Sequence, residues 1–306
     1  LIIFPTMSAL MSYMVVQLMD PMWLDGLIYL PLICWGVHRL VDEGKLVPYI
    51  VPLALMFIAH FYIGYMVGIF TIFYFCWYCL SREGRILPKK FFSRCVAFGI
   101  GTLVALMCAA FVLITVYNSL KLGMFEFTDT DFSLATQFDF LTFITKLFPM
   151  SYDTVYPEGM PMIYCGTAVL ILVPLFFMND RITMKEKTST GLLTFLLVIL
   201  MYIKPADMAM HGFQVPNRLP YRYSFIFSFL MIVMAFRAFE NLEGITAKNI
   251  GGIFFGLMVF LFWCERENYS HFQLFETKTS ETGDTTNVIQ GIWVSMIALA
   301  AYIALI

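Results

Sequence analysis

Charged side chains are scarce in this sequence. They make up 13% of the 306 residues, whereas 60% of the residues are hydrophobic. Water-soluble domains carry about 25% charged residues, so this composition excludes an ordinary soluble domain. The apolar residues also form runs close to the ~20 residues that cross a bilayer as a helix. These two features predict an all-α fold in which a polytopic bundle of helices is integral to the membrane.

Other absences exclude further classes of function. The 19 lysines and arginines are balanced by 21 acidic residues, and the net charge of −2 provides no basic field for nucleic acid. No phosphate-binding P-loop and no dinucleotide fingerprint occurs, so we expect no chemistry driven by ATP. The seven cysteines lack the spacing of a metal site. The CWYC motif at 76–79 lies inside an apolar run and is interpreted as buried small residues rather than a redox pair.

The N-terminal end of the sequence predicts a segment of a longer protein. Leu1 opens directly into an apolar run, with no charged region and no cleavage site of the kind that marks a signal peptide. We therefore expect residues 1–306 to form a single transmembrane domain within a longer chain. We expect other parts of that domain to lie outside residues 1–306.

A hydropathy window divides the chain into ten predicted membrane helices. Their ranges are 1–18, 23–39, 46–60, 62–81, 95–117, 159–178, 189–204, 223–240, 250–265 and 287–306. The apolar stretch 46–81 is too long for one span, and we divide it at the polar atoms of His60 and Tyr62. Of the 19 basic residues, twelve then fall in one set of loops and seven in the other. Since the richer set faces the cytoplasm, the unusual polar segments are expected on the outer face.

The segment HGFQVPNRLPYRY (211–223) is polar although long apolar runs lie on both sides of it. An arginine at a helix end can extend its charge to the lipid headgroups. Anchoring in the membrane is therefore the interpretation of Arg222 that involves no bound ligand. Headgroup anchoring does not require asparagine and histidine beside the arginine. A guanidinium group binds a phosphate through two parallel hydrogen bonds. We therefore interpret Arg222, with Arg218, as a site for the phosphate of a lipid-linked donor.

A second polar segment is DPMWLDG (20–26). Aspartate at a membrane helix is costly and indicates a functional candidate. Asp20 also fits a helix N-cap ahead of Pro21, whereas Asp25 is expected one turn into the helix, where capping explains it less well. A carboxylate facing a cavity there would serve as general base or would hold a cation.

Two further segments lie on the predicted outer face. His60 and Tyr62 belong to HFYIGY (60–65), where tyrosines are also typical of the aromatic belt at the membrane surface. Within the outer loop 118–158, apolar residues recur at helical spacing over 139–148, which predicts an amphipathic helix in the interface plane. The TDTD motif supplies Asp129 and Asp131, a weak candidate for a divalent cation because a third ligand is missing.

Four blocks carry a resemblance to a known family. They are SALMSYMVVQLMDPMWLDGLIYLPLI (8–33), HFYIGYMVGIF (60–70), LFPMSYDTVYPEGMPMIYCG (147–166) and HGFQVPNRLPYRYSFIFSF (211–229). In this order and spacing the chain resembles the YfhO family of bacterial membrane proteins over essentially its whole length. Members of that family resemble GT-C glycosyltransferases, which are many-helix enzymes that use a polyprenyl-phosphate sugar on the outer membrane face.

The resemblance implies transfer of a sugar to a cell-envelope polymer such as teichoic acid, in the bacterial plasma membrane. It places the catalytic aspartate in a first outer loop upstream of this segment, which leaves Asp25 and Asp20 as the candidates within it. The expected donor-phosphate residues are Arg222, Arg218, Asn217 and His211. The expected substrate-packing residues are Tyr221, Tyr223, Trp23, His60 and Tyr62.

A transporter of lipid or glycan without catalytic activity is the alternative interpretation, because it also explains many membrane helices. Transporters typically carry internal repeats and polar residues deep within broken helices. Here the polar clusters lie at the predicted outer rim, and no convincing repeat relates the two halves. This pattern favours the transferase. A noncatalytic scaffold for envelope assembly is a third interpretation.

Overall fold

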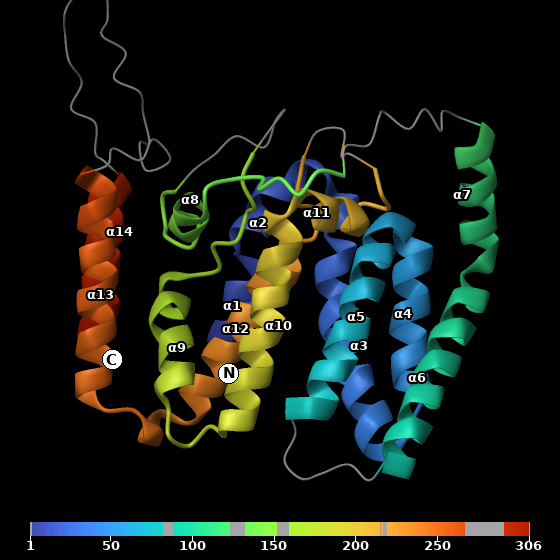
Figure 1. The fold of residues 1–306 in the computed structure, drawn as a ribbon, viewed down its shortest axis with the longest axis horizontal. Coiled ribbons are helices and arrows are strands. Elements are labelled where there is room, and N and C mark those ends of the chain that lie inside the picture. The colour runs from blue at the N-terminus through green and yellow to red at the C-terminus, as the bar shows by residue number, and fades with distance from the viewer. Residues whose placement is uncertain are drawn as a thin grey trace, which may run out of the picture. The chain divides into compact units, whose positions relative to one another are not determined.

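The computed structural model describes residues 2–81, 88–122, 132–151, 159–214, 216, 219–266 and 291–305. Within these ranges the regular secondary structure is helical throughout, which confirms the predicted all-α class (Figure 1). Among the described residues, four helical segments are long and apolar enough to cross a membrane, namely Pro21–Glu43, Phe61–Ser81, Lys89–Cys108 and Ala247–Arg266. Shorter apolar helical segments accompany them, at Ile3–Met19 (which contains more than one helix), Val47–Ala59, Ala110–Leu122, Thr167–Met178 and Ile292–Ile303.

The chain divides into two compact units. Unit 1 comprises Leu1–Tyr13, Thr136–Thr183 and Asn217–Ile306, and unit 2 comprises Met14–Ala135 and Met184–Pro216. Unit 2 contains α3 (Asp25–Glu43), α4 (Val47–Ala59), α5 (Phe61–Ser81), α6 (Pro88–Cys108), α7 (Ala110–Leu122), α10 (Met184–Tyr202) and α11 (Lys204–Met210). Unit 1 contains α1 (Ile3–Ala9), α8 (Phe140–Thr145), α9 (Thr167–Met178), α12 (Ser224–Glu240), α13 (Ala247–Arg266) and α14 (Gly291–Leu305). The short helix α2 (Ser12–Val16) contains the boundary between them.

Two glycines shape the hairpin of α3 and α4 in unit 2. Gly44 ends α3 in the left-handed conformation (φ 77°), and its N–H donates to the carbonyl of Leu40 at 3.0 Å. Glycine is the residue that adopts this conformation without steric cost. Gly36 lies at a close approach of the two helices, since a Cβ at this position would lie 2.6 Å from Cα of Tyr49. The hairpin therefore depends on the absence of a side chain at position 36.

Substitution of Gly36 tests this close approach. We expect Gly36→Leu to destabilise the purified full-length protein by about 3 kcal/mol, because overpacking of a close contact forces the backbones apart. The matched control is Gly251→Leu on α13, where an added Cβ meets no atom within 4 Å. Thermal unfolding in detergent should show a lower Tm for the first variant alone. Equal Tm values for the two variants would contradict the packing described here.

The predicted division of the stretch 46–81 is confirmed, because α4 ends at Ala59 and α5 begins at Phe61. His60 between them has an extended backbone (φ −152°). Its Nδ1 accepts the N–H of Ile63 at 3.2 Å, and its carbonyl accepts the N–H of Gly64 at 2.8 Å. His60 therefore serves as the N-terminal cap of α5, since it satisfies amides that the first turn of a helix leaves without partners.

Three predicted spans differ in the structure. The segment 1–18 forms α1 and α2 instead of one helix, with the N–H of Ser12 bonded to the carbonyl of Tyr164 at 2.8 Å. The segment 95–117 belongs to α6 and α7, which meet at a single turn residue, Ala109. The segment 159–178 is helical only from Thr167 onward.

The nonhelical start of that last segment has a physical reason in unit 1. Residues 159–166 end at Gly166, whose φ of 121° interrupts a helix. Their carbonyls bond to α12 instead: Ser228 Oγ donates to the carbonyl of Ile163 at 3.2 Å, and Ser224 Oγ donates to that of Met162 at 3.4 Å. These bonds satisfy backbone groups that a helix would satisfy internally.

Other elements of unit 1 are held by polar caps and an apolar cluster. Buried Asn179 joins the ends of α9 and α12, since its Nδ2 donates to the carbonyl of Asn241 at 2.7 Å. Within the predicted amphipathic segment 139–148, α8 covers six residues, and Asp139 caps it by accepting the N–H of Thr142 at 2.9 Å. The cluster formed around α9, α13 and α14 comprises Phe148, Leu170, Leu261, Cys264, Ile292 and Met296.

Candidate functional site

An apolar pocket of about 550 Å³ lies within unit 2, among α4, α5, α6 and α7. Its volume is in the range of small-molecule and cofactor sites. The residues that line it are Tyr49, Leu53, Phe57, Phe61, Tyr62, Tyr65, Gly68, Ile69, Ile72, Phe98, Thr102, Leu106, Leu113, Leu120, His211, Gly212 and Gln214. Tyr49 and Thr102 bond to each other through their hydroxyls at 2.7 Å. Because most of the lining residues are apolar, most of the pocket wall suits a hydrocarbon chain.

The polar part of the lining comes from the end of α11 and the first turn of α5. His211, Gly212 and Gln214 follow α11, and Tyr62 lies near them, its ring centroid 6.2 Å from that of His211. Tyr65 Oη donates to the carbonyl of Ala209 at 2.9 Å, which ties α5 to α11. The pocket is therefore amphipathic, with an apolar wall and one polar end.

His211 and Asp207 form a buried pair at this polar end. Their exposed fractions are 1% and 3%. Nδ1 of His211 lies 2.9 Å from the carbonyl of Asp207 and 3.3 Å from its Oδ1. Both neighbours accept hydrogen bonds, so Nδ1 carries the proton and donates it. A buried carboxylate beside an imidazole is an arrangement that fixes the orientation of the ring.

Asp207 is a residue that the sequence analysis missed. It lies four residues before His211, and residues four apart share one face of a helix. It also lies in a short polar interruption between two apolar runs, KPAD at 204–207. These two signals are present in the sequence and would have indicated the pair.

Arg222 belongs to unit 1 and is half-buried. Its Nε donates to the carbonyl of Leu219 at 3.2 Å, and its own carbonyl accepts the hydroxyl of Tyr13 at 2.7 Å. Leu219 and Tyr221, which both precede Arg222 in the chain, have positive φ values of 50° and 56°. Non-glycine residues in this conformation store strain of about 1–3 kcal/mol each and cluster at functional sites.

The aromatic residues beside Arg222 are buried within the same unit. Tyr223 is 1% exposed and Tyr221 is 5% exposed. The ring of Tyr221 meets that of Phe138 edge-on, with the centroids 5.8 Å apart. Asn217 and Arg218, the other predicted phosphate ligands, lie outside the residues that the structure describes.

The predicted phosphate-binding set therefore divides between the two units, with His211 in unit 2 and Arg222 in unit 1. The two candidate cation ligands, Asp129 and Asp131, also lie outside the described residues. In the described ranges no group of three or more His, Cys, Asp or Glu side chains is placed to hold a metal ion.

The remaining candidates lie at the start of α3 in unit 2. Asp20 occupies the N-cap position of a short 3-10 helix, Pro21–Trp23, and its side chain makes no capping hydrogen bond. Asp25 is the first residue of α3, not one turn into it as the sequence analysis expects, because the 3-10 helix takes the preceding residues. A carboxylate in the first turn interacts favourably with the helix dipole. Trp23 is buried at 8% exposure.

Comparison with known proteins identifies a family. The family described as bacterial membrane protein YfhO matches residues 1–305. No curated protein and no solved structure matches the chain. The match spans both units and every segment discussed above.

Proposed function

The chain belongs to the YfhO family of bacterial membrane proteins, and on that premise we propose that it acts as a GT-C glycosyltransferase. The proposed reaction transfers a sugar from a polyprenyl-phosphate donor to a cell-envelope polymer such as teichoic acid. In this proposal the shorter helices complete a bundle of ten spans in the bacterial plasma membrane, with the functional face outside the cell. No nucleotide is required, in accordance with the lack of nucleotide motifs.

The amphipathic pocket of unit 2 is the observation that supports this proposal best. A polyprenyl phosphate joins a long branched hydrocarbon to an anionic head, and the pocket joins an apolar wall to a polar end. Burial of the hydrocarbon would contribute about 25 cal/mol per Å² of apolar surface. In this assignment Phe57, Ile69 and Leu106 contact the isoprenoid chain, and His211 with Gln214 lies nearest the phosphate.

The proposed chemistry is a direct displacement at the anomeric carbon of the sugar. A carboxylate takes the proton of the acceptor hydroxyl, whose oxygen forms a bond to that carbon. The bond between the carbon and the phosphate oxygen breaks, and the polyprenyl phosphate leaves with the electron pair. Cationic and hydrogen-bonding groups stabilise the departing charge. Asp25 and Asp20 remain the candidates for the carboxylate within this chain.

The pocket assignment concerns His211 of unit 2, and the predicted phosphate contact of Arg222 in unit 1 is a separate proposal. Arg222 supplies a guanidinium group in unit 1, and His211 supplies an imidazole in unit 2. Because the two residues belong to separate units, each needs its own test. The experiment below addresses Arg222, and the Discussion addresses His211.

The test of the function compares surface polymers by mass spectrometry in cells with and without the full-length gene. We expect a sugar to disappear from a teichoic acid or similar polymer on deletion, and to return with the wild-type gene. Arg222→Lys keeps the charge but loses bidentate binding, so it should restore less than about 10% of the sugar. This tenfold loss corresponds to ~1.4 kcal/mol of free energy of interaction with the phosphate. Arg181→Lys, at an exposed arginine of the same unit, should restore it fully.

Protein levels measured by immunoblot separate a loss of activity from a loss of folding. An unchanged glycan profile on deletion would contradict the transferase and would favour the transport of lipid or glycan. Full restoration by Arg222→Lys would leave the transferase intact and remove Arg222 from the phosphate site.

A further inference from the structure

The helix α11 carries the polar end of the pocket, and at seven residues it is too short to be stable by itself. Isolated helices shorter than about 12–15 residues are marginal in water, so α11 depends on contacts with the rest of unit 2. At its first residue, the N–H of Lys204 donates to the carbonyl of Ala135 at 3.0 Å. The position of His211, which follows the helix directly, depends on what holds the last turn.

The last turn of α11 ends in a Schellman cap. The N–H of Phe213 donates to the carbonyl of Met208 at 2.7 Å, and the N–H of Gly212 lies 3.4 Å from the carbonyl of Ala209. Gly212 has the left-handed conformation that this cap requires, with φ of 69°. The contact with Ala209 is longer than an ordinary N–H···O bond. This carbonyl, which has two lone pairs, can therefore accept a second and stronger donor.

Tyr65 of α5 supplies that donor. Its Oη donates to the carbonyl of Ala209 at 2.9 Å, and Tyr65 lines the same pocket as His211, Gly212 and Gln214. A phenol hydroxyl carries a single proton. Because the carbonyl of Ala209 takes this proton, the hydroxyl holds the helix instead of donating to a ligand. The ring remains available to contact a hydrocarbon chain.

The imidazole of His211 is bonded to the turn that Tyr65 holds. The backbone N–H of His211 donates to the carbonyls of Asp207 and Met208 at 3.1 and 3.0 Å, and Nδ1 lies 2.9 Å from the carbonyl of Asp207. Ala209 lies within this same turn, two residues before His211. A shift of the turn away from α5 would therefore carry the imidazole with it.

We propose that Tyr65 is a positioning residue for His211. Its hydroxyl holds the last turn of α11 against α5 and thereby places the imidazole at the polar end of the pocket. The inference rests on the proposed function for its ligand, because that function assigns the phosphate of the donor to His211. The contact between Tyr65 and Ala209 is open to a test that uses no donor.

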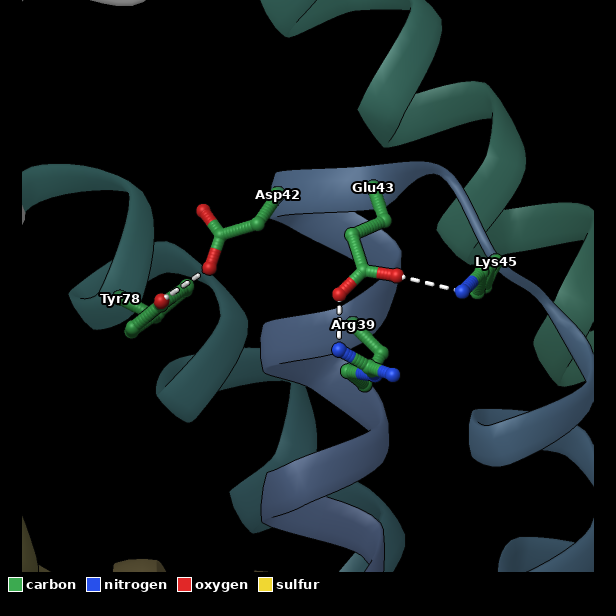
Figure 2. A network of polar contacts seen from close by, with 5 residues as sticks. All are labelled: Arg39, Asp42, Glu43, Lys45 and Tyr78. Atoms are coloured by element: carbon green, nitrogen blue, oxygen red, sulfur yellow. Dashed lines mark hydrogen bonds and ion pairs between the residues drawn. The ribbon is translucent and has the colours of Figure 1, made fainter.

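A second tyrosine of α5 provides a matched control (Figure 2). Tyr78 lies near the other end of the helix and donates its hydroxyl to Oδ2 of Asp42 at 2.6 Å. It is not among the described residues that line the pocket. Tyr65→Phe and Tyr78→Phe each remove one hydrogen-bonded hydroxyl from the same helix and keep the ring. They differ in the contact that is lost.

The first measurement is hydrogen–deuterium exchange of the purified full-length protein without donor. Tyr65→Phe should speed exchange of the Gly212 and Phe213 amides about fivefold, as expected when one hydrogen bond that holds the turn is lost. Tyr78→Phe should leave these two amides unchanged. Unchanged exchange in Tyr65→Phe would overturn the proposal, whatever ligand the pocket binds.

The second measurement is crosslinking of a photoactivatable polyprenyl phosphate in a double-mutant cycle. Tyr65→Phe should weaken crosslinking about fivefold in otherwise wild-type protein, and Tyr78→Phe should leave it unchanged. In the His211→Gln background, Tyr65→Phe should weaken crosslinking less than about twofold, because the group that it positions is already gone. An equal loss in both backgrounds would overturn the proposal, since Tyr65 would then act independently of His211.

The two measurements separate this inference from the proposed function. Faster exchange in Tyr65→Phe, with no crosslinking to the wild type, would contradict the proposed donor while it supports the role of Tyr65 in placing the end of α11. Crosslinking to the wild type that Tyr65→Phe leaves unchanged would support the donor and overturn the role of Tyr65.

Discussion

Leucine at position 68 should weaken binding of the polyprenyl-phosphate donor at least about tenfold, or ~1.4 kcal/mol. Gly68 lines the pocket on α5. A Cβ at this position would lie 3.4 Å from Cζ of Phe57, which is an ordinary contact that requires no shift. The rest of the leucine side chain would then occupy cavity space that the isoprenoid chain needs. Helix packing should survive, because the added atoms enter empty space.

The measurement is crosslinking of a photoactivatable polyprenyl phosphate to the purified full-length protein. Gly99→Leu is the matched control, since it changes a mid-helix glycine of α6 at which an added Cβ meets no atom within 4 Å. Equal crosslinking of the two variants at all donor concentrations would show that the pocket does not hold the donor chain.

His211→Gln should reduce sugar transfer by about 10–100-fold, in the range of a lost hydrogen bond to a charged group. Glutamine lacks the imidazole ring that Asp207 orients at the polar end of the pocket. Asp207→Asn should reduce transfer by about tenfold, because the backbone carbonyl at 207 still anchors Nδ1 at 2.9 Å while the carboxylate is lost. The expected order is therefore wild type, then Asp207→Asn, then His211→Gln.

Initial rates over a range of donor concentrations check this order, with thermal unfolding as the measure of folding. Asp180→Asn is the control, since Asp180 is exposed in the loop after α9. A role in donor binding predicts that His211→Gln raises the KM for the donor more than it lowers kcat. Wild-type rates in His211→Gln would remove this pair from the reaction.

Much of the helical organisation follows from local features of the sequence. The apolar runs correctly place the cores of α3, α5, α12 and α13. The break at His60 is predictable because a polar side chain interrupts a run too long for one span. The start of α3 is less accurate: a proline after Asp20 favours a separate 3-10 turn, which moves Asp25 to the first position of the helix.

The features that the sequence did not predict depend on contacts between residues far apart in the chain. Residues 159–166 are apolar enough for a span, yet Ser224 and Ser228 of α12 satisfy their carbonyls in a nonhelical form. The pocket also escapes prediction, because its lining comes from positions scattered between 49 and 214. Among the candidate ligands, His211 is visible as an isolated polar residue. Its partner Asp207 is also accessible from the sequence through the spacing of four residues, and α11 then places the two side chains one turn apart.

The most direct test of the account follows a labelled donor in liposomes that contain the full-length protein. The donor is a polyprenyl phosphate with a radiolabelled sugar, and the acceptor polymer is supplied on one side of the bilayer. Sugar transfer predicts that the label moves to the polymer and that unglycosylated polyprenyl phosphate accumulates in equal amount. Movement of the intact labelled lipid across the bilayer, with no sugar on the polymer, would contradict the account and would identify a transporter.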